Sequence, residues 1–296
     1  MLPRRHIRIK TFQTLYSHSQ HIEKKDFNLN SEFEKNLKAY LNLYYFIIEL
    51  LFLLKETATK HIKIKQKNLI PTNEDLNPNK KFINNQILKN IKLKNNKQFT
   101  DSEKLKKIVN IIFNKIKKTD SYINYMKIPN NQLEEDRNFI LHILKTHFIK
   151  NQNIHDFIED YSIYWNDDFI VSYNLLVEKI KNNDPLYKVQ LFRNNDDKLY
   201  AKELLKKTIK NNDEINKIIN KIVLNWETER IALSDLILIK MAITEITYIE
   251  NIPYKVSLDE YIEISKEYST PKSNEFINGV LDVYIKSILP EKLTKE

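Results

Sequence analysis

The chain has 296 residues, of which 42% are hydrophobic, with a net charge of +9 and no cysteine. This composition excludes a disordered chain, a disulfide framework and any thiol that acts as a nucleophile or a zinc ligand. The positive charge suits a polyanionic partner such as nucleic acid, although a solvated basic surface has the same composition.

Helical periodicity dominates the chain, and no alternating strand pattern is found, so we predict an all-α protein. The first helix is expected at about 3–20 and the second at 31–66. The most apolar stretch, 40–55, is interrupted by Glu49 and is interpreted as a buried core helix rather than a membrane span. Because the charged N-terminus lacks an apolar signal segment, we expect a soluble, cytoplasmic protein.

The next region is rich in asparagine and lysine. We predict a loop over 68–100 with a short helix near 82–92. A further helix is expected from about residue 102, with Asp101 or Ser102 as its N-cap.

The second half contains an internal similarity at an offset of about 61 residues, between 138–165 and 199–226. Each copy has the pattern of a helix, a turn that contains asparagine, and a second helix ending near Trp165 or Trp226. We favour duplication of a helical hairpin, while chance similarity between helical segments stays open.

The C-terminal part is expected to form three helices. Residues 235–249 are apolar on almost every side, which indicates a central buried helix. Ser257 and Glu260 have the spacing of a capping box for a helix over 258–268. For the last helix, Thr270 is the expected cap.

Gly279 is the only glycine in the chain and lies within this last apolar helical pattern. Glycine in a helix interior costs about 0.8–1 kcal/mol relative to alanine. We therefore expect another helix to approach its backbone so closely that a Cβ would clash; a tolerated neutral glycine is the alternative.

No motif for catalysis is found. One glycine cannot form a phosphate-binding loop or a dinucleotide fingerprint, and the seven histidines show no zinc-site spacing. We therefore predict no catalytic residue, no cofactor and no metal, and hence a protein that is not an enzyme.

Two basic clusters are more informative. Arg4, Arg5 and Arg8 lie in the first turns of the first helix, where cations oppose the helix dipole and so point to a use other than stability. Guanidinium groups bind phosphate well, although a frayed basic terminus is the simpler interpretation.

The second cluster joins Lys255 to Lys272 and Ser273, at the start of the last helix, where free N–H groups and a lysine make an anion site. Phe276 follows one turn later and offers a ring to an unstacked base, or else packs in the core. Basic groups beside an aromatic ring are typical of single-stranded RNA binding.

Three stretches together resemble the NusB transcription antitermination family. They are "RRHIRIKTFQTLYS" near the N-terminus, "DLILIKMAITEI" from residue 235, and "IPYKVSLDEYIEISKEYSTPKSNEFINGVLD" from residue 252. The resemblance covers roughly 3–20 and 199–288, and the segment around "FINGVLD" is its most specific part.

The resemblance implies a helical bundle of two packed subdomains. It also implies binding of boxA-type single-stranded RNA together with NusE, a ribosomal protein, in an RNA polymerase elongation complex that transcribes ribosomal RNA operons processively. The residues that match the RNA-facing positions of the family are Arg4, Arg5, Arg8, Gln13, Lys255, Lys272, Ser273 and Phe276. Tyr16 and Asp235 match positions near the NusE face.

This chain departs from the family in length, because the family is usually about half as long. We expect a first NusB-like helix at 1–20, a helical insertion with the first repeat copy at 21–196, and the NusB-like core and C-terminal subdomain at 197–290. Two alternatives stay open: an RNA-binding domain related to ribosomal RNA methyltransferases, and a helical scaffold without RNA binding.

Overall fold

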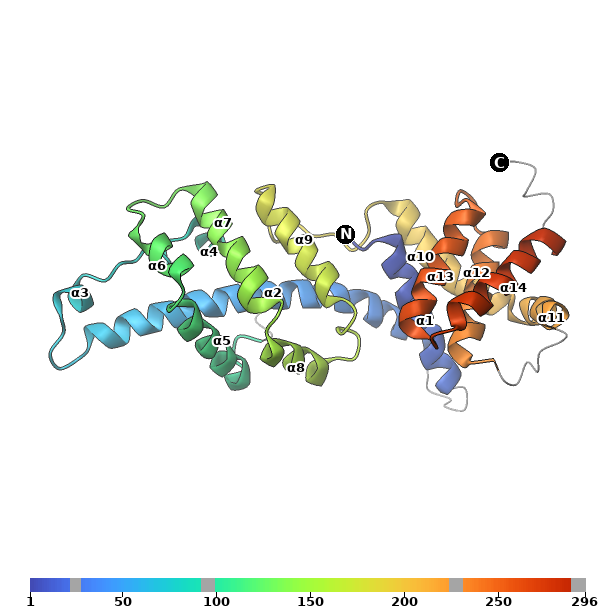
Figure 1. Cartoon of the computed structure of the whole chain (residues 1–296), viewed down its shortest axis with the longest axis horizontal. Helices are drawn as coiled ribbons and strands as arrows, with labels where there is room; N and C mark the ends of the chain where they lie inside the picture. The colour runs from blue at the N-terminus through green and yellow to red at the C-terminus, as the bar shows by residue number, and fades with distance from the viewer. Residues whose placement is uncertain (22–27, 92–98, 224–230, 289–296) are drawn as a thin grey trace. The chain divides into compact units, whose positions relative to one another are not determined.

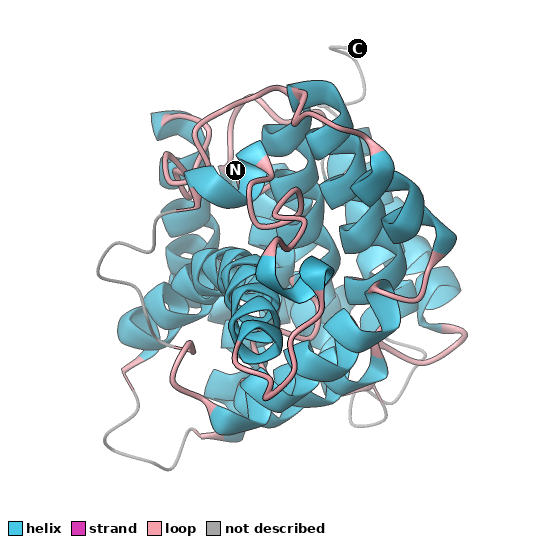
Figure 2. Ribbon diagram, turned by 90° about the vertical axis from the view of Figure 1, so that its left-hand side faces the viewer, coloured by secondary structure: helices cyan, strands magenta, loops and turns pink. Residues whose placement is uncertain are grey.

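A computed structural model describes residues 1–21, 28–91, 99–223 and 231–288. Every regular element in these residues is a helix, and Figure 2 shows no strand among them. The predicted all-α class is confirmed.

The chain forms two compact units. The first consists of Met1–Leu37 and Leu191–Glu296, and the second of Lys38–Gln190. The helix α2 (Leu29–Gln66) contributes its first residues to the first unit and the rest to the second. The proposed insertion boundaries at 21 and 196 stay a prediction.

The first unit joins the N-terminal helix to the five C-terminal helices (Figure 1). Besides the start of α2 these are α1 (Arg4–Gln20), α10 (Asn195–Lys210), α11 (Asn212–Ile222), α12 (Leu233–Tyr248), α13 (Tyr254–Tyr268) and α14 (Ser273–Ile288). Helix α12 contacts α1, α10, α11, α13 and α14. Its residues Leu238, Ile239 and Ala242 are fully buried, so α12 is the central helix that the apolar pattern predicted.

The second unit is built around the apolar part of α2. Its other helices are α3 (Asn73–Leu76), α4 (Gln86–Asn90), α5 (Glu103–Ile116), α6 (Asp120–Lys127), α7 (Leu133–Ile143), α8 (Gln152–Tyr161) and α9 (Phe169–Lys181). An aromatic cluster lies in its core, where the ring of Trp165 is 5.2 Å from that of Phe46 and 5.5 Å from that of Phe99.

By length and composition α2 is able to cross a membrane, but 72% of its most apolar window is buried inside the protein. Glu49, which interrupts the apolar stretch 40–55, is also buried and accepts a hydrogen bond from the Phe99 N–H at 2.9 Å. We conclude that α2 is a core helix, as its pattern predicted, because a carboxylate with an internal donor is tolerated inside a protein.

The helix expected from residue 102 begins as predicted, since the Ser102 hydroxyl accepts a hydrogen bond from the Leu105 N–H. It is interrupted before residue 120, where the Thr119 hydroxyl accepts from the Tyr122 N–H and caps α6. The second cap explains why one periodic segment becomes two helices.

Both repeat copies form a helix, a turn and a second helix. In the first copy, α7 continues through a single π-helical turn (Leu144–Phe148) to Asn151 and α8. In the second copy, α10 and α11 meet at Asn211. Trp165 is buried, whereas Trp226 lies outside the described residues. Duplication of the hairpin stays a prediction.

The predicted start of α13 is wrong. The helix begins at Tyr254 after Pro253, so Ser257 and Glu260 lie inside it. Their side chains bond to other helices instead of capping this one. Helix α14 likewise begins at Ser273, so Thr270, the expected cap, lies three residues before the helix.

The expected close approach at Gly279 is also wrong. Apart from its chain neighbours and the backbone of its own helix, no atom of the described residues lies within 4 Å of a Cβ built on this residue, and the residue is exposed on α14. Its φ is not positive, so the helix itself does not require glycine here. Gly279 is therefore a tolerated surface glycine within the first unit.

Candidate nucleic-acid interface

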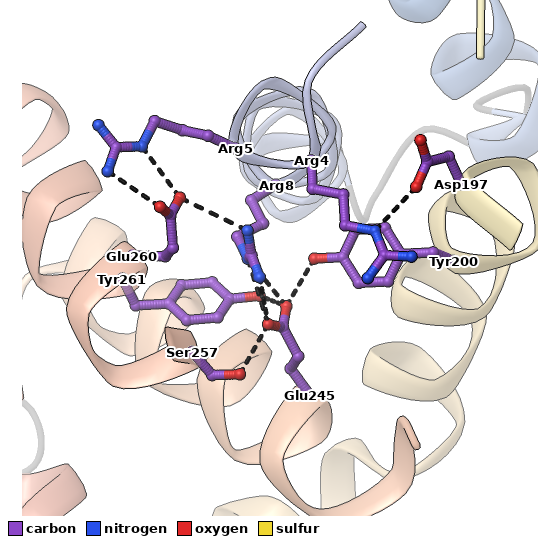
Figure 3. A network of polar contacts seen from close by, with 9 residues as sticks. All are labelled: Arg4, Arg5, Arg8, Asp197, Tyr200, Glu245, Ser257, Glu260 and Tyr261. Carbon is purple, nitrogen blue, oxygen red and sulfur yellow. Dashed lines mark hydrogen bonds and ion pairs between the residues drawn. The ribbon is translucent and has the colours of Figure 1, made fainter. Parts of the chain in front are cut away.

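The arginine cluster lies at the start of α1, where Pro3 is the N-cap and the first turn contains no acidic residue. Arg4 donates to Asp197 of α10 at 2.8 Å, and its guanidinium carbon lies 5.2 Å from the centre of the Tyr200 ring (Figure 3). Its side chain keeps 39% of its surface exposed. Arg4 thus joins α1 to α10 and still reaches solvent.

Arg5 points toward α13. Its Nε and one terminal nitrogen donate to the two carboxylate oxygens of Glu260 at 2.9 and 3.0 Å, and half of its side chain is exposed. The hydrogen bond to Glu260 raises the pKa of Arg5, as do the charges of Glu263 and Glu267. A phosphate that binds Arg5 therefore has to compete with an acidic face of α13.

Arg8 is buried, with 3% of its side chain exposed. Its guanidinium donates to both oxygens of Glu245 in α12, the shortest bond being 2.5 Å, and to Glu260 at 3.4 Å. It also lies over the rings of Tyr200 and Tyr261, at 5.6 and 5.8 Å. This is an internal ion pair with further aromatic contacts.

The carboxylate of Glu245 is the centre of this network (Figure 3). Besides Arg8 it accepts hydrogen bonds from the hydroxyls of Tyr200 at 2.6 Å, Ser257 at 2.7 Å and Tyr261 at 2.9 Å. Burial raises the pKa of Glu245, but the hydrogen bond and charge of Arg8 and the hydroxyls of Tyr200 and Ser257 outweigh it and lower the pKa. Four helices, α1, α10, α12 and α13, are thus fixed to one carboxylate.

The prediction that Arg8 contacts RNA is wrong, because a phosphate cannot reach a guanidinium that is buried in the core and paired with Glu245. The sequence did not predict this network, because its members lie far apart along the chain. One signal was present: Glu245 lies inside an almost wholly apolar helix, and a buried carboxylate needs a partner.

The predicted roles of Ser273 and Asp235 are corrected in the same way. Both are buried, and the Ser273 hydroxyl donates to the Asp235 carboxylate at 2.8 Å. Ser269 donates to the other carboxylate oxygen, and the Thr270 N–H donates to the Ser273 hydroxyl. These bonds hold the first turn of α14 on the N-terminal turn of α12, so neither side chain faces a ligand.

Lys255, Lys272 and Phe276 reach the surface to different degrees. Lys255 is exposed, with its Nζ 5.6 Å from the centre of the Tyr254 ring. Lys272 is exposed directly before α14, and Phe276, one turn later, is partly exposed. Of the predicted C-terminal RNA contacts, these three side chains are accessible to a ligand.

Lys255 and Lys272, which were predicted to form one cluster, lie apart in the structure. Lys255 lies in the first turn of α13, whereas Lys272 follows the end of that helix. At 1.5 Å per residue, about 20 Å of helix axis lies between Lys255 and Tyr268, from which the chain turns to Lys272. The expected single cluster is therefore two positions at opposite ends of α13.

Helices α1 and α13 run in the same direction, because Arg5 contacts Glu260 and the Phe12 ring lies 5.4 Å from the Tyr268 ring. Arg5 thus lies between the two lysines along the axis of α13. The accessible basic groups are distributed along these helices rather than gathered at one point.

Gln13 and Tyr16 lie farther along α1. The side-chain oxygen Oε1 of Gln13 accepts a hydrogen bond from the side-chain amide of Asn36 in α2 at 3.2 Å. Tyr16 is 40% exposed, and its ring lies 6.1 Å from that of Phe12. The roles predicted for these residues stay predictions.

The C-terminal part of the chain is similar to known proteins. A family model described as "NusB family" matches residues 174–286, which include Lys255, Lys272 and Phe276. Over 70 residues the chain is 51% identical to "Transcription antitermination protein NusB" of Salinibacter ruber, covering 24% of this chain and 44% of that protein.

Two further relatives have the same name. The protein of Chloroherpeton thalassium is 52% identical over 58 residues, 20% of this chain and 28% of its own length. That of Pseudothermotoga lettingae is 43% identical over 68 residues, 23% of this chain and 49% of its own length. The chain thus spans less than half the length of these relatives, and no solved structure matches it.

Proposed function

Because a NusB family model matches residues 174–286, we propose that this chain is a non-enzymatic transcription antitermination factor. In this proposal it binds boxA-type single-stranded RNA together with NusE in the cytoplasm. The complex joins an RNA polymerase elongation complex and promotes processive transcription of ribosomal RNA operons. The name of the relatives, transcription antitermination protein NusB, supports this proposal.

The observation that carries the proposal is the exposure of Lys272 and Phe276 within the matched segment. Lys272 lies at the N-terminal end of a helix of 16 residues, where a phosphate is favoured by the helix dipole and the terminal N–H groups. Phe276 is partly exposed one turn away, so we expect one nucleotide to contact both residues.

Arg5 and Lys255 extend this surface along α13. Since Arg5 is paired with Glu260, its contribution requires exchange of a carboxylate for a phosphate. We therefore assign the larger share of RNA binding to Lys272 and Phe276 and a smaller share to Arg5. Arg8 has no place in the proposed contact surface.

The proposal is tested with the full chain and a short fluorescent boxA-like RNA, titrated with and without NusE at several salt concentrations. Each phosphate contact with a single strand contributes about −0.7 to the slope of log affinity against log salt. Lys272→Ala is expected to weaken binding and to reduce the magnitude of the slope by about that amount. Phe276→Leu is expected to cost about 1–3 kcal/mol of binding free energy, the value of one base-stacking contact.

Lys266→Ala is the matched control, because Lys266 is an exposed lysine near the end of α13 that is paired with Glu263. It should bind RNA like the unchanged protein. Equal affinity for a scrambled RNA, or unchanged binding by Lys272→Ala, contradicts the proposal and favours a helical scaffold.

A further inference from the structure

The second unit contains a cavity of about 440 Å³ that has no role in the proposed function. It lies between α2, α5, α6 and the segment 74–83, and its lining includes His61, Phe82, Phe113, Lys117 and Tyr122. Its size falls within the range of small-molecule sites, roughly 300–1,000 Å³. These residues lie outside the matched segment 174–286, so they are not explained by the family.

Aromatic rings form one wall of this cavity. The ring of Phe82 lies 5.7 Å from both the Phe113 and the Tyr122 rings, and the latter two are 6.3 Å apart. Ala58 and Ile62 of α2 add aliphatic surface to the lining. Phe82 and Phe113 are each only 2% exposed, so the partly exposed Tyr122 is the ring that a flat ligand contacts here.

A cationic group lies beside this wall. The Lys117 ammonium is 3.0 Å from His61 Nδ1 and 5.2 Å from the centre of the Phe113 ring. Because an ammonium only donates, His61 Nδ1 accepts, and His61 Nε2 therefore carries the proton and donates to Asn110 Oδ1 at 2.9 Å. Lys117 thus uses one of its three donors on His61.

The charges around Lys117 favour an anion. Burial lowers the pKa of Lys117, and the positive charges of Lys65 and Lys118 lower it further. Of the two carboxylates in the lining, Asp75 is engaged with the Thr72 N–H at 3.1 Å, and Glu74 is exposed. Within the described residues, no carboxylate forms an ion pair with Lys117.

We infer that this cavity binds a nucleotide, with its base against the ring of Tyr122 and its phosphate at Lys117. The lining provides an aromatic ring and a cation, and a nucleotide combines the two groups that match them, a planar base and an anionic phosphate. The same chemistry has two sources, a free mononucleotide or the 5′-terminal nucleotide of a single-stranded RNA. The inference is independent of RNA binding at Lys272.

The test uses the full chain and 5′-AMP in a calorimetric titration, with adenosine and inorganic phosphate as separate probes. AMP is expected to bind more tightly than either. Lys117→Met should weaken AMP at least about tenfold, as expected for loss of a hydrogen bond to a charged group. Lys107→Met changes an exposed lysine of the same helix outside the lining and should leave AMP binding unchanged.

Ile62→Trp is a second variant, which fills the cavity from a partly buried position on α2 and should also abolish AMP binding. It keeps the test decisive if Lys117→Met lowers the melting temperature. Two results overturn the inference. The first is an affinity for AMP that neither variant changes, and the second is an affinity for adenosine that equals or exceeds the affinity for AMP.

The two sources are distinguished by competition. A six-nucleotide RNA with a 5′-phosphate is added to the AMP complex, alongside the same RNA with a 5′-hydroxyl. Displacement of AMP only by the phosphorylated RNA identifies an RNA end as the ligand, and no displacement by either identifies the free nucleotide. RNA held at Lys272 displaces no AMP from this cavity, so failure of the two proposals is distinguishable.

Discussion

Arg8 and Glu245 form a buried ion pair between α1 and α12, 237 positions apart in the sequence. The two side chains are 3% and 0% exposed, and the hydroxyls of Tyr200, Ser257 and Tyr261 complete the shell of Glu245. A residue that was expected to bind RNA thus stabilises the unit that carries the proposed RNA surface.

Arg8→Met is expected to destabilise the first unit by about 3–5 kcal/mol, because it leaves the Glu245 carboxylate buried without its cation. Hydrogen exchange of the α1 and α12 amides measures this effect in the first unit by itself. Arg5→Met is the matched control, since half of the Arg5 side chain is exposed and such pairs contribute only about 0–1 kcal/mol. Equal effects of the two changes contradict the structural role of Arg8.

The stability of the first unit is expected to fall in acid. The pKa of Glu245 is lowered in the folded protein from an ordinary value of about 4.5, so the folded state binds this proton less tightly than the unfolded state. The contribution of Glu245 is therefore complete above about pH 4.5 and is lost as the pH falls through the folded pKa. Urea unfolding at a series of pH values measures it.

Glu245→Gln should flatten this acid dependence, because the amide does not titrate, while lowering stability at neutral pH. Glu103→Gln is the control, since Glu103 is an exposed residue paired with Lys106. If the Glu245→Gln variant loses as much stability in acid as the unchanged protein does, other carboxylates cause the loss.

Gly279→Ala is expected to stabilise α14 by roughly 0.5–1 kcal/mol, the difference in helix propensity between the two residues. Beyond the chain neighbours and the nearby backbone of α14, the added methyl group meets no atom of the described residues within 4 Å. Thermal unfolding of the two proteins compares them directly. A lower melting temperature in the alanine variant means that a close neighbour is present after all.

Asp235→Ala is expected to cost about 1.5–3 kcal/mol, because it removes the charged acceptor of the Ser269 and Ser273 hydroxyls. The loss should be greatest at the start of α14, where faster amide exchange reports it. Asp282→Ala removes an exposed acid of α14 that is paired with Lys286 and should change stability little. If Asp235 were mainly a partner contact, the two variants would be equally stable.

Local features of the fold were predictable because their causes lie within a few residues. The helix expected at 3–20 is α1 (Arg4–Gln20), and the one expected at 31–66 is α2 (Leu29–Gln66). Of the two candidate caps, Asp101 and Ser102, the structure has Ser102. Apolar spacing and side-chain caps act over one or two turns, so the sequence displays them directly.

The site was less predictable because its charges are paired over long distances. Arg5 and Arg8 are both basic residues at a helix start, yet one is half exposed and the other buried. The difference arises from Glu245 in another helix. Ser257 has the spacing of a cap but faces the same carboxylate. Spacing alone cannot tell a free cation from a paired one.

The continuity of residues 38–190 also bears on how the protein is made. The second unit is one uninterrupted stretch, whereas the first joins both ends of the chain. During synthesis at about 5–20 residues per second, Arg8 waits roughly 12–47 s for Glu245 to be translated. All of the second unit is therefore synthesised before the first unit is able to fold. Helix α1 is translated early, but it packs against α10, α12 and α13 only after those helices have been made.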